Sequence, residues 1–183
     1  YRLQSLEYQP STSGLIVGYD TRFLSDKFAE TAARVVATND IPVYLVQDAA
    51  PTPAVAYAIK DKKTAGAIMI TASHNPPEYN GVKFKPEYAG SALPEFTEEI
   101  EKYLGDIIVR NQEVSTEPRA PIEKFDPRPA YFRQVESLVN LPTIARAKFK
   151  VVADPMYGAG RGWLRSILEE AGIEVDRMSV SSE

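Results

Sequence analysis

The chain has 183 residues, of which 44% are hydrophobic and 25% charged, so it can fill a core of one domain, or of one domain and part of a second. Its formal net charge is -4 and its sequence pI is about 5.2, which argues against nucleic-acid binding through phosphate neutralisation. The absence of cysteine excludes disulfides, zinc–thiolate sites and cysteine nucleophiles.

No apolar run approaches the roughly 20 residues that a transmembrane helix needs, and the start does not resemble a signal peptide. We therefore expect no membrane contact and a cytoplasmic protein, which a cysteine-free composition suits. The chain begins with Tyr1 instead of methionine and ends abruptly at Glu183, which leads us to expect a piece of a longer protein.

The first part of the chain alternates apolar strand patterns with amphipathic helix patterns. In chain order, we expect a strand at 14–19, a helix at 25–38, a strand at 41–46, a helix at 52–63 and a strand at 65–70. Within the first helix, the apolar face is expected to comprise Phe28, Ala32, Val35 and Val36. Such alternation predicts an α/β fold: a three-layer α/β/α domain with a mostly parallel mixed sheet.

The pattern changes after the third strand. Asn80-Gly81 is the strongest short turn signal, and residues 82–85 alternate as a strand with Val82 and Phe84 on one face. A helix is expected at 94–104, a surface excursion at 105–128 and another helix at 129–141.

A domain boundary is expected within residues 142–148. Beyond it a strand–loop–helix pattern starts again at 149–153, 154–160 and the segment that ends at Gly172. We expect a first domain at 1–145 and, at 146–183, the beginning of a second one that stops before it closes a core.

Three loops are expected at the carboxyl ends of the strands, where ligands gather in open α/β sheets. They are residues 20–22, 51–53 and 71–77, and the third is the most informative. Its two prolines prevent a helix, so Ser73 would be held on a stiff polar loop at the mouth of the site. Lys83 can return towards the same place across the Asn-Gly turn.

This arrangement suits phosphoryl transfer to or from a serine oxygen, which depends mainly on positioning and positive charge. Arg22 and Lys83 can supply charge, Asn75 and the loop amides can donate hydrogen bonds, and His74 or Lys83 can move the hydroxyl proton. A divalent metal is expected to neutralise the phosphate.

Two of these side chains have equally simple structural interpretations. Arg22 can pair with Asp20 or Asp26 instead of a phosphate, and a surface pair of this kind contributes little to stability. His74, the only histidine, can serve merely to shape the loop.

The sequence Thr-Ala-Ser-His-Asn-Pro at 71–76, followed by Tyr-Asn-Gly-Val-Lys at 79–83, resembles the phosphoserine loop of the α-D-phosphohexomutase superfamily. This superfamily includes phosphoglucomutases, phosphomannomutases and phosphoglucosamine mutases. Residues 17–22 and 51–53 are similar to two further segments of its first domain, and residues 154–160 resemble the opening loop of its second.

The resemblance implies that Ser73 is phosphorylated in the resting enzyme and binds Mg²⁺ through its phosphate. The phosphoryl group would pass to a hexose phosphate substrate and give a bisphosphate intermediate, and the other phosphate would return to Ser73. Lys83 would be a general acid/base candidate, and glucose 1,6-bisphosphate or a related bisphosphate would be the activator.

The departures matter too. The sequence lacks the family's Gly-Thr-x-Gly-x-Arg segment and its Asp-Gly-Asp-x-Asp metal cluster, so we expect little turnover from this chain without the remaining domains of its parent. The alternatives are a phosphoglucosamine or phosphopentose specificity, or a non-catalytic sugar-phosphate-binding homologue. A degenerate relative would be expected to lose Ser73 or Lys83, and this sequence has both.

Overall fold

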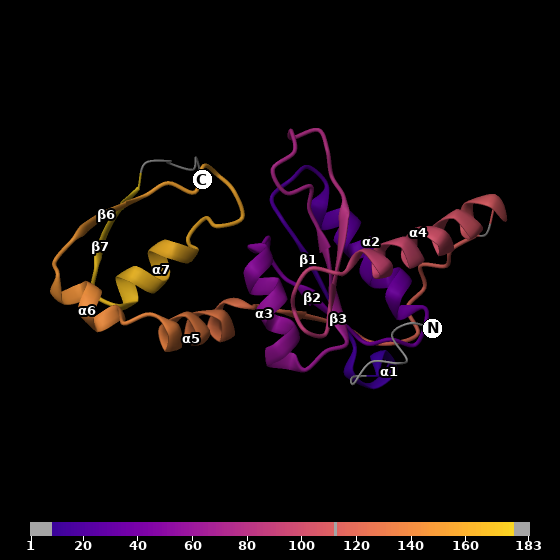
Figure 1. The fold of residues 1–183 in the computed structure, drawn as a ribbon, viewed down its shortest axis with the longest axis horizontal. Helices are drawn as coiled ribbons and strands as arrows, with labels where there is room; N and C mark the ends of the chain where they lie inside the picture. Colours follow the sequence, from indigo (N-terminus) through magenta and orange to yellow (C-terminus); the bar gives the residue numbers. More distant parts are fainter. Residues whose placement is uncertain (1–8, 112, 178–183) are drawn as a thin grey trace.

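The structure is a computed structural model that describes residues 9–111 and 113–177 (Figure 1). In chain order its elements are α1 (Pro10–Ser13), β1 (Leu15–Tyr19), α2 (Ser25–Ala37), β2 (Val43–Val46), α3 (Thr52–Lys62), β3 (Gly66–Ile70), β4 (Val82–Pro86), α4 (Pro94–Val109), β5 (Ile122–Phe125), α5 (Arg128–Leu138), α6 (Leu141–Arg146), β6 (Lys150–Ala153), α7 (Trp163–Glu170) and β7 (Glu174–Arg177).

The first five strands form one sheet in the order β4-β3-β1-β2-β5. Only β4 runs antiparallel to its neighbour, so the sheet is mixed and mostly parallel. Successive residues of β1 face opposite sides: Ile16 belongs to a core cluster with α3, and Val17 belongs to one with α2. The predicted three-layer α/β/α arrangement is confirmed.

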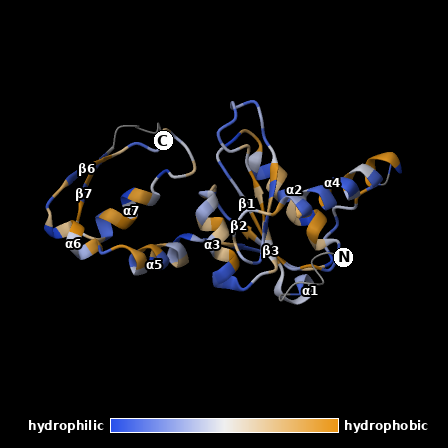
Figure 2. Ribbon diagram, viewed as in Figure 1, coloured by the Kyte–Doolittle hydropathy of each residue, from blue (hydrophilic) through white to orange (hydrophobic). Residues whose placement is uncertain are grey.

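The central strands are mostly apolar, as Figure 2 shows, because they are buried on both faces. The helix packed on one face, α2, meets the sheet through Ala29, Ala33 and Ala37, all 0% exposed. The predicted apolar face was partly right: Ala32 and Val36 pack against the same cluster, but Phe28 is 47% exposed. Alanines at intervals of four residues form a narrow stripe that lets the helix approach the strands closely, whereas a phenylalanine at the contact would hold it away.

One strand and two short helices were not predicted. The strand β5 lies inside the expected surface excursion at 105–128 and pairs in parallel with β2 at the edge of the sheet. Its four residues, Ile-Glu-Lys-Phe, are half-buried or exposed and carry only two apolar side chains, so they gave no apolar run to detect. The short helices α1 and α6 left similarly weak patterns.

The Asn80-Gly81 pair does not form a tight hairpin turn. Neither residue has a positive φ, and an eleven-residue connection, 71–81, joins β3 to β4, with the Thr71 N–H donating to the Gly81 carbonyl at 2.9 Å. The expected turn was wrong because the Asn80 side chain is engaged elsewhere, as described below.

The strands β6 and β7 form a second, two-stranded parallel sheet against α7, with a small core cluster of its own (Figure 1). At the start of α7, Trp163 packs edge-on against Tyr131 and Phe132 of α5 and joins the core cluster of the first sheet. The expected boundary segment 142–148 is largely the helix α6. The division at 145 and 146 stays a prediction.

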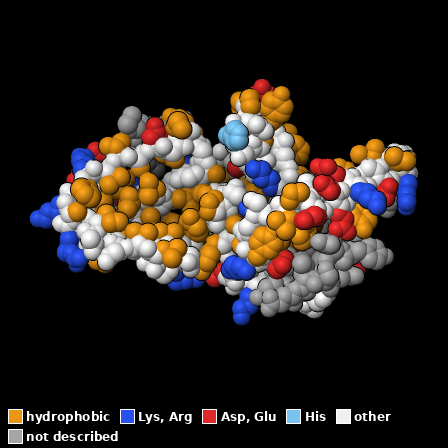
Figure 3. Space-filling model, viewed as in Figure 1, with side chains coloured by type: hydrophobic (Ala, Val, Ile, Leu, Met, Phe, Trp, Pro, Cys, Tyr) orange, Lys and Arg blue, Asp and Glu red, His pale blue; other side chains and the backbone are white. Residues whose placement is uncertain are grey.

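The surface shows apolar side chains at the far end of α4, where Ile108 and Val109 are 68% and 86% exposed (Figure 3). No helix within residues 9–111 and 113–177 has both the length and the apolar character needed to cross a membrane.

Gly18 lets α3 pack closely against the end of β1. A Cβ at this position would lie 2.6 Å and 2.8 Å from the two methyl carbons of Val55, which is fully buried and cannot move aside. We predict that Gly18→Ala lowers the free energy of unfolding in urea by about 1–3 kcal/mol through overpacking. Gly105→Ala, in an open part of α4, should raise it by about 0.5–1 kcal/mol. Equal stability of wild type and Gly18→Ala would contradict this packing.

Candidate active site at the carboxyl edge of the first sheet

The loops that follow β1, β2 and β3 meet at one edge of the sheet and line a hollow of about 650 Å³. The loop after β1 contributes Arg22, and the loop after β3 contributes Ser73, His74 and Asn75. Gly158 and Ala159 also line this hollow, from the loop between β6 and α7 in the second unit of the chain, which comprises β6, α7 and β7. Four of the five predicted site residues therefore lie together, while Lys83 is not part of the lining.

Ser73 lies exposed at the hollow in a left-handed backbone conformation, with φ 57°. Its N–H donates to Thr71 Oγ1 at 2.9 Å, and the Asn75 N–H donates to the Ala72 carbonyl at 3.0 Å. These bonds close a turn with Ser73 and His74 at its tip. A serine in this conformation costs on the order of 1–3 kcal/mol, so the surrounding contacts must hold it.

The Arg22 side chain lies along the inner side of this loop. Its Nη2 donates to the carbonyls of Ser73 and Asn75 at 2.9 and 2.6 Å, and its Nη1 donates to those of Pro76 and Tyr79 at 2.8 Å each. Its Nε lies 3.4 Å from Asp20 Oδ2. The alternative of a pair with Asp20 is thus seen, although it is well shielded from solvent. The contact with a phosphate stays a prediction.

A second set of polar contacts fixes the far end of the same connection. Asp20 Oδ1 accepts hydrogen bonds from the Arg22 N–H and from Ser25 Oγ, each at 3.0 Å. Asn80 Nδ2 donates to Ser25 Oγ at 2.8 Å, and Asn80 Oδ1 accepts from the Gly81 N–H. Ser25 and Asn80 were not predicted as site residues, because their local patterns indicated only the start of the helix at 25–38 and a turn.

Lys83 lies on β4 opposite Met69, at the end of the strand pair from which the Ser73 loop emerges. Two residues further along, burial lowers the pKa of the Lys85 ammonium, and the like charge of Lys83 lowers it further. At the end of β1, burial raises the pKa of the Tyr19 phenol, and nearby carboxylates, Asp48 foremost, add to this effect. The local electrostatics is therefore cationic on β4 and anionic around Tyr19.

The acidic side chains do not assemble a metal site by themselves. Within residues 9–111 and 113–177, no group of three or more His, Cys, Asp or Glu residues could hold a metal ion. Asp20, the acid that lines the hollow, already accepts hydrogen bonds from Ser25 and Arg22. The residues present thus do not fit a complete Mg²⁺ site.

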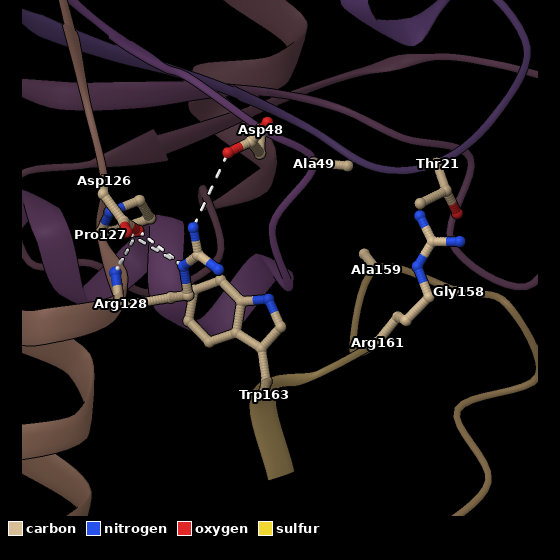
Figure 4. Close-up of a pocket in the computed structure, with 10 residues that line it drawn as sticks. All are labelled: Thr21, Asp48, Ala49, Asp126, Pro127, Arg128, Gly158, Ala159, Arg161 and Trp163. Atoms are coloured by element: carbon tan, nitrogen blue, oxygen red, sulfur yellow. Dashed lines mark hydrogen bonds and ion pairs between the residues drawn. The ribbon is translucent and has the colours of Figure 1, made fainter. Parts of the chain in front are cut away.

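A smaller hollow of about 250 Å³, drawn in Figure 4, shares Thr21, Gly158 and Ala159 with the first one. In it Arg128 pairs with Asp126 at 3.0 Å and with Asp48 at 3.7 Å. Figure 4 also shows Arg161, from the loop before α7, extending towards Thr21. The two units of the chain therefore face each other across polar side chains beside the Ser73 hollow.

The fold and this edge define an α/β domain whose site is centred on an exposed serine loop. The model of the family "Phosphoglucomutase/phosphomannomutase, alpha/beta/alpha domain I" matches residues 3–108. The chain belongs to the phosphoglucomutase/phosphomannomutase family, as the motif at 71–83 predicted.

Individual relatives agree. A phosphoglucomutase from Staphylococcus saprophyticus is 30% identical over 180 residues, which cover 91% of this chain and 31% of that protein. A crystal structure from Thermus thermophilus, assigned as a phosphomannomutase, matches with a TM-score of 0.80 and 34% identity over 89% of this chain and 36% of that one. The phosphoglucomutase pp63/parafusin from Paramecium, with a TM-score of 0.69 at 22% identity, shares the fold over 87% of this chain and 34% of that one. The chain spans about a third of the length of these relatives.

We predict that Ser25→Ala destabilises the chain, because it removes a donor from the carboxylate of Asp20 and the acceptor of the Asn80 amide. Ser25 is fully buried, so the free energy of unfolding in urea should fall by about 1–3 kcal/mol. Ser137→Ala, which removes an exposed hydroxyl on α5, should change it by less than about 0.5 kcal/mol. A loss no larger for Ser25→Ala than for Ser137→Ala would count against the buried network.

Proposed function

We propose that this chain is the phosphoserine-carrying part of a phosphohexomutase, an intramolecular phosphotransferase that interconverts hexose 1-phosphate and hexose 6-phosphate. The observation that supports this most is Ser73, exposed in a left-handed conformation beside His74 and Asn75 at the hollow. The family membership and the names of the relatives point the same way.

In the proposed reaction Ser73 Oγ attacks a phosphorus atom of a hexose bisphosphate. The Oγ–P bond forms as the P–O bond to the sugar breaks, the hydroxyl proton leaves to a base, and the released sugar oxygen accepts a proton. The return step runs in the opposite sense on the other sugar oxygen. Catalysis of this kind depends on positioning and charge around the transferred group.

His74 and Lys83 are the proposed proton carriers, and His74 has the better position because it lines the hollow with Ser73. Asn75 and the loop N–H groups are proposed donors to the phosphate oxygens. Arg22 adds positive charge beside the loop even while its N–H groups contact carbonyls, and a direct phosphate contact would require it to exchange some of them.

Mg²⁺ is the proposed metal, with the phosphate of Ser73 as one ligand. It would neutralise charge on the phosphoryl group. Since the described carboxylates do not complete a site, the other ligands would come from further domains of a longer, cytoplasmic protein.

The first test is phosphopeptide mapping of that longer protein after brief incubation with labelled glucose 1,6-bisphosphate and Mg²⁺. We predict label on the peptide that contains Ser73, and its loss in Ser73→Ala. Ser91→Ala, in the exposed loop after β4, should be labelled like the wild type.

Label on Ser73 would leave the choice of sugar open, and glucosamine and pentose bisphosphates can then be compared with glucose and mannose bisphosphates as donors. No label from any of these donors, in protein shown to be folded, would contradict the mutase and support a sugar-phosphate-binding homologue without catalysis.

A further inference from the structure

Within the connection 71–81, residues 72–79 form a loop of two successive turns. The Asn75 N–H donates to the Ala72 carbonyl and closes the first, and the Tyr79 N–H donates to the Pro76 carbonyl and closes the second. Pro76 and Pro77 have no N–H group, so this stretch is short of the backbone donors that usually hold a loop together. Something else must fix one turn against the other.

The Arg22 guanidinium occupies that position. Its Nη2 contacts two carbonyls of the first turn, those of Ser73 and Asn75, and its Nη1 contacts two of the second, those of Pro76 and Tyr79. With Nε paired to Asp20, each of the five N–H donors has an acceptor within reach. The planar fork therefore bridges both turns with a single rigid group.

The Arg22 guanidinium is itself held in place by Asp20. Asp20 accepts hydrogen bonds from the backbone N–H of Arg22 and from the hydroxyl of Ser25. These bonds fix the orientation of the carboxylate that pairs with Nε of Arg22. The guanidinium side chain is only 13% exposed and that of Asp20 only 16%, which reduces screening by solvent. Ser25, at the buried start of α2, therefore holds Asp20, Asp20 holds Arg22, and Arg22 holds the Ser73 loop.

We propose that Arg22 is a positioning residue for Ser73, acting as a clamp that holds both turns of the 72–79 loop through their carbonyls and keeps the serine in its left-handed conformation. This inference rests on the proposed function for its catalytic consequence, but not for the clamp itself. A lysine cannot replace the clamp, because an ammonium is a point charge with three donors and cannot reproduce the planar fork.

The clamp is tested by amide hydrogen exchange on the 183-residue chain as wild type, Arg22→Lys and Arg22→Ala. Exchange of the amides of Ser73, Asn75 and Tyr79 should accelerate roughly tenfold to a hundredfold in both variants, the effect expected from the loss of one or two charge-assisted hydrogen bonds. Amides of β1 and β3 should keep their wild-type rates. Arg165→Ala, which removes an exposed arginine paired with Glu169 on α7, is the matched control and should leave the loop unchanged.

The catalytic consequence is tested with the labelling reaction of the longer protein. Arg22→Lys should slow labelling of Ser73 at saturating bisphosphate by at least tenfold, with a smaller change in the half-saturating concentration. Millimolar guanidinium should partly restore Arg22→Ala and leave Arg22→Lys unchanged. If Arg22→Ala does not fold, Arg22→Lys decides the matter alone.

Wild-type exchange rates in the loop of Arg22→Lys would overturn the clamp, whatever the activity. Faster loop exchange with undiminished labelling would overturn the positioning role. If loop exchange is faster in Arg22→Lys but the wild type is never labelled at Ser73, the clamp is supported and the proposed function is contradicted. Failure of the clamp and failure of the proposed function are therefore distinguishable.

Discussion

One guanidinium group supplies hydrogen bonds that a proline-containing loop cannot make for itself. The loop after β3 must leave the sheet, turn twice and return as β4, and two of its residues have no N–H group to donate. Arg22 contributes donors to four of its carbonyls and so links its two turns. A loop fixed in this way can present a strained serine without the flexibility that loops usually have.

The sheet makes this contact possible by placing two distant segments side by side. Because β1 and β3 are parallel neighbours, the residues that follow them, around 20 and 71, emerge at the same edge. The alanine stripe of α2 keeps that helix close to the strands, so its buried first residue, Ser25, can bridge Asp20 and Asn80. The packing of the core and the geometry of the site are therefore parts of one arrangement.

The second unit of the chain, β6, α7 and β7, also contributes to the lining of the site. Trp163 joins its helix to aromatic side chains of α5, and the loop before that helix brings Gly158 and Ala159 to the hollow. With Arg128 neutralised by Asp48 and Asp126, the polar surface between the units has most of its charges paired. The hollow in front of Ser73 is thus bounded by both units.

The sequence by itself determined the α/β class, the order of the main strands and helices, and the serine loop with its family. These features depend on local patterns: apolar runs, turn residues and a contiguous motif. Only the tertiary structure decided what Arg22, Ser25 and Asn80 do, since their partners lie more than 50 residues away or depend on a neighbouring strand. It also decided that Lys83 is not among the residues that line the hollow and that a weakly apolar segment becomes the edge strand β5, because strand pairing and packing, not composition, fix those positions.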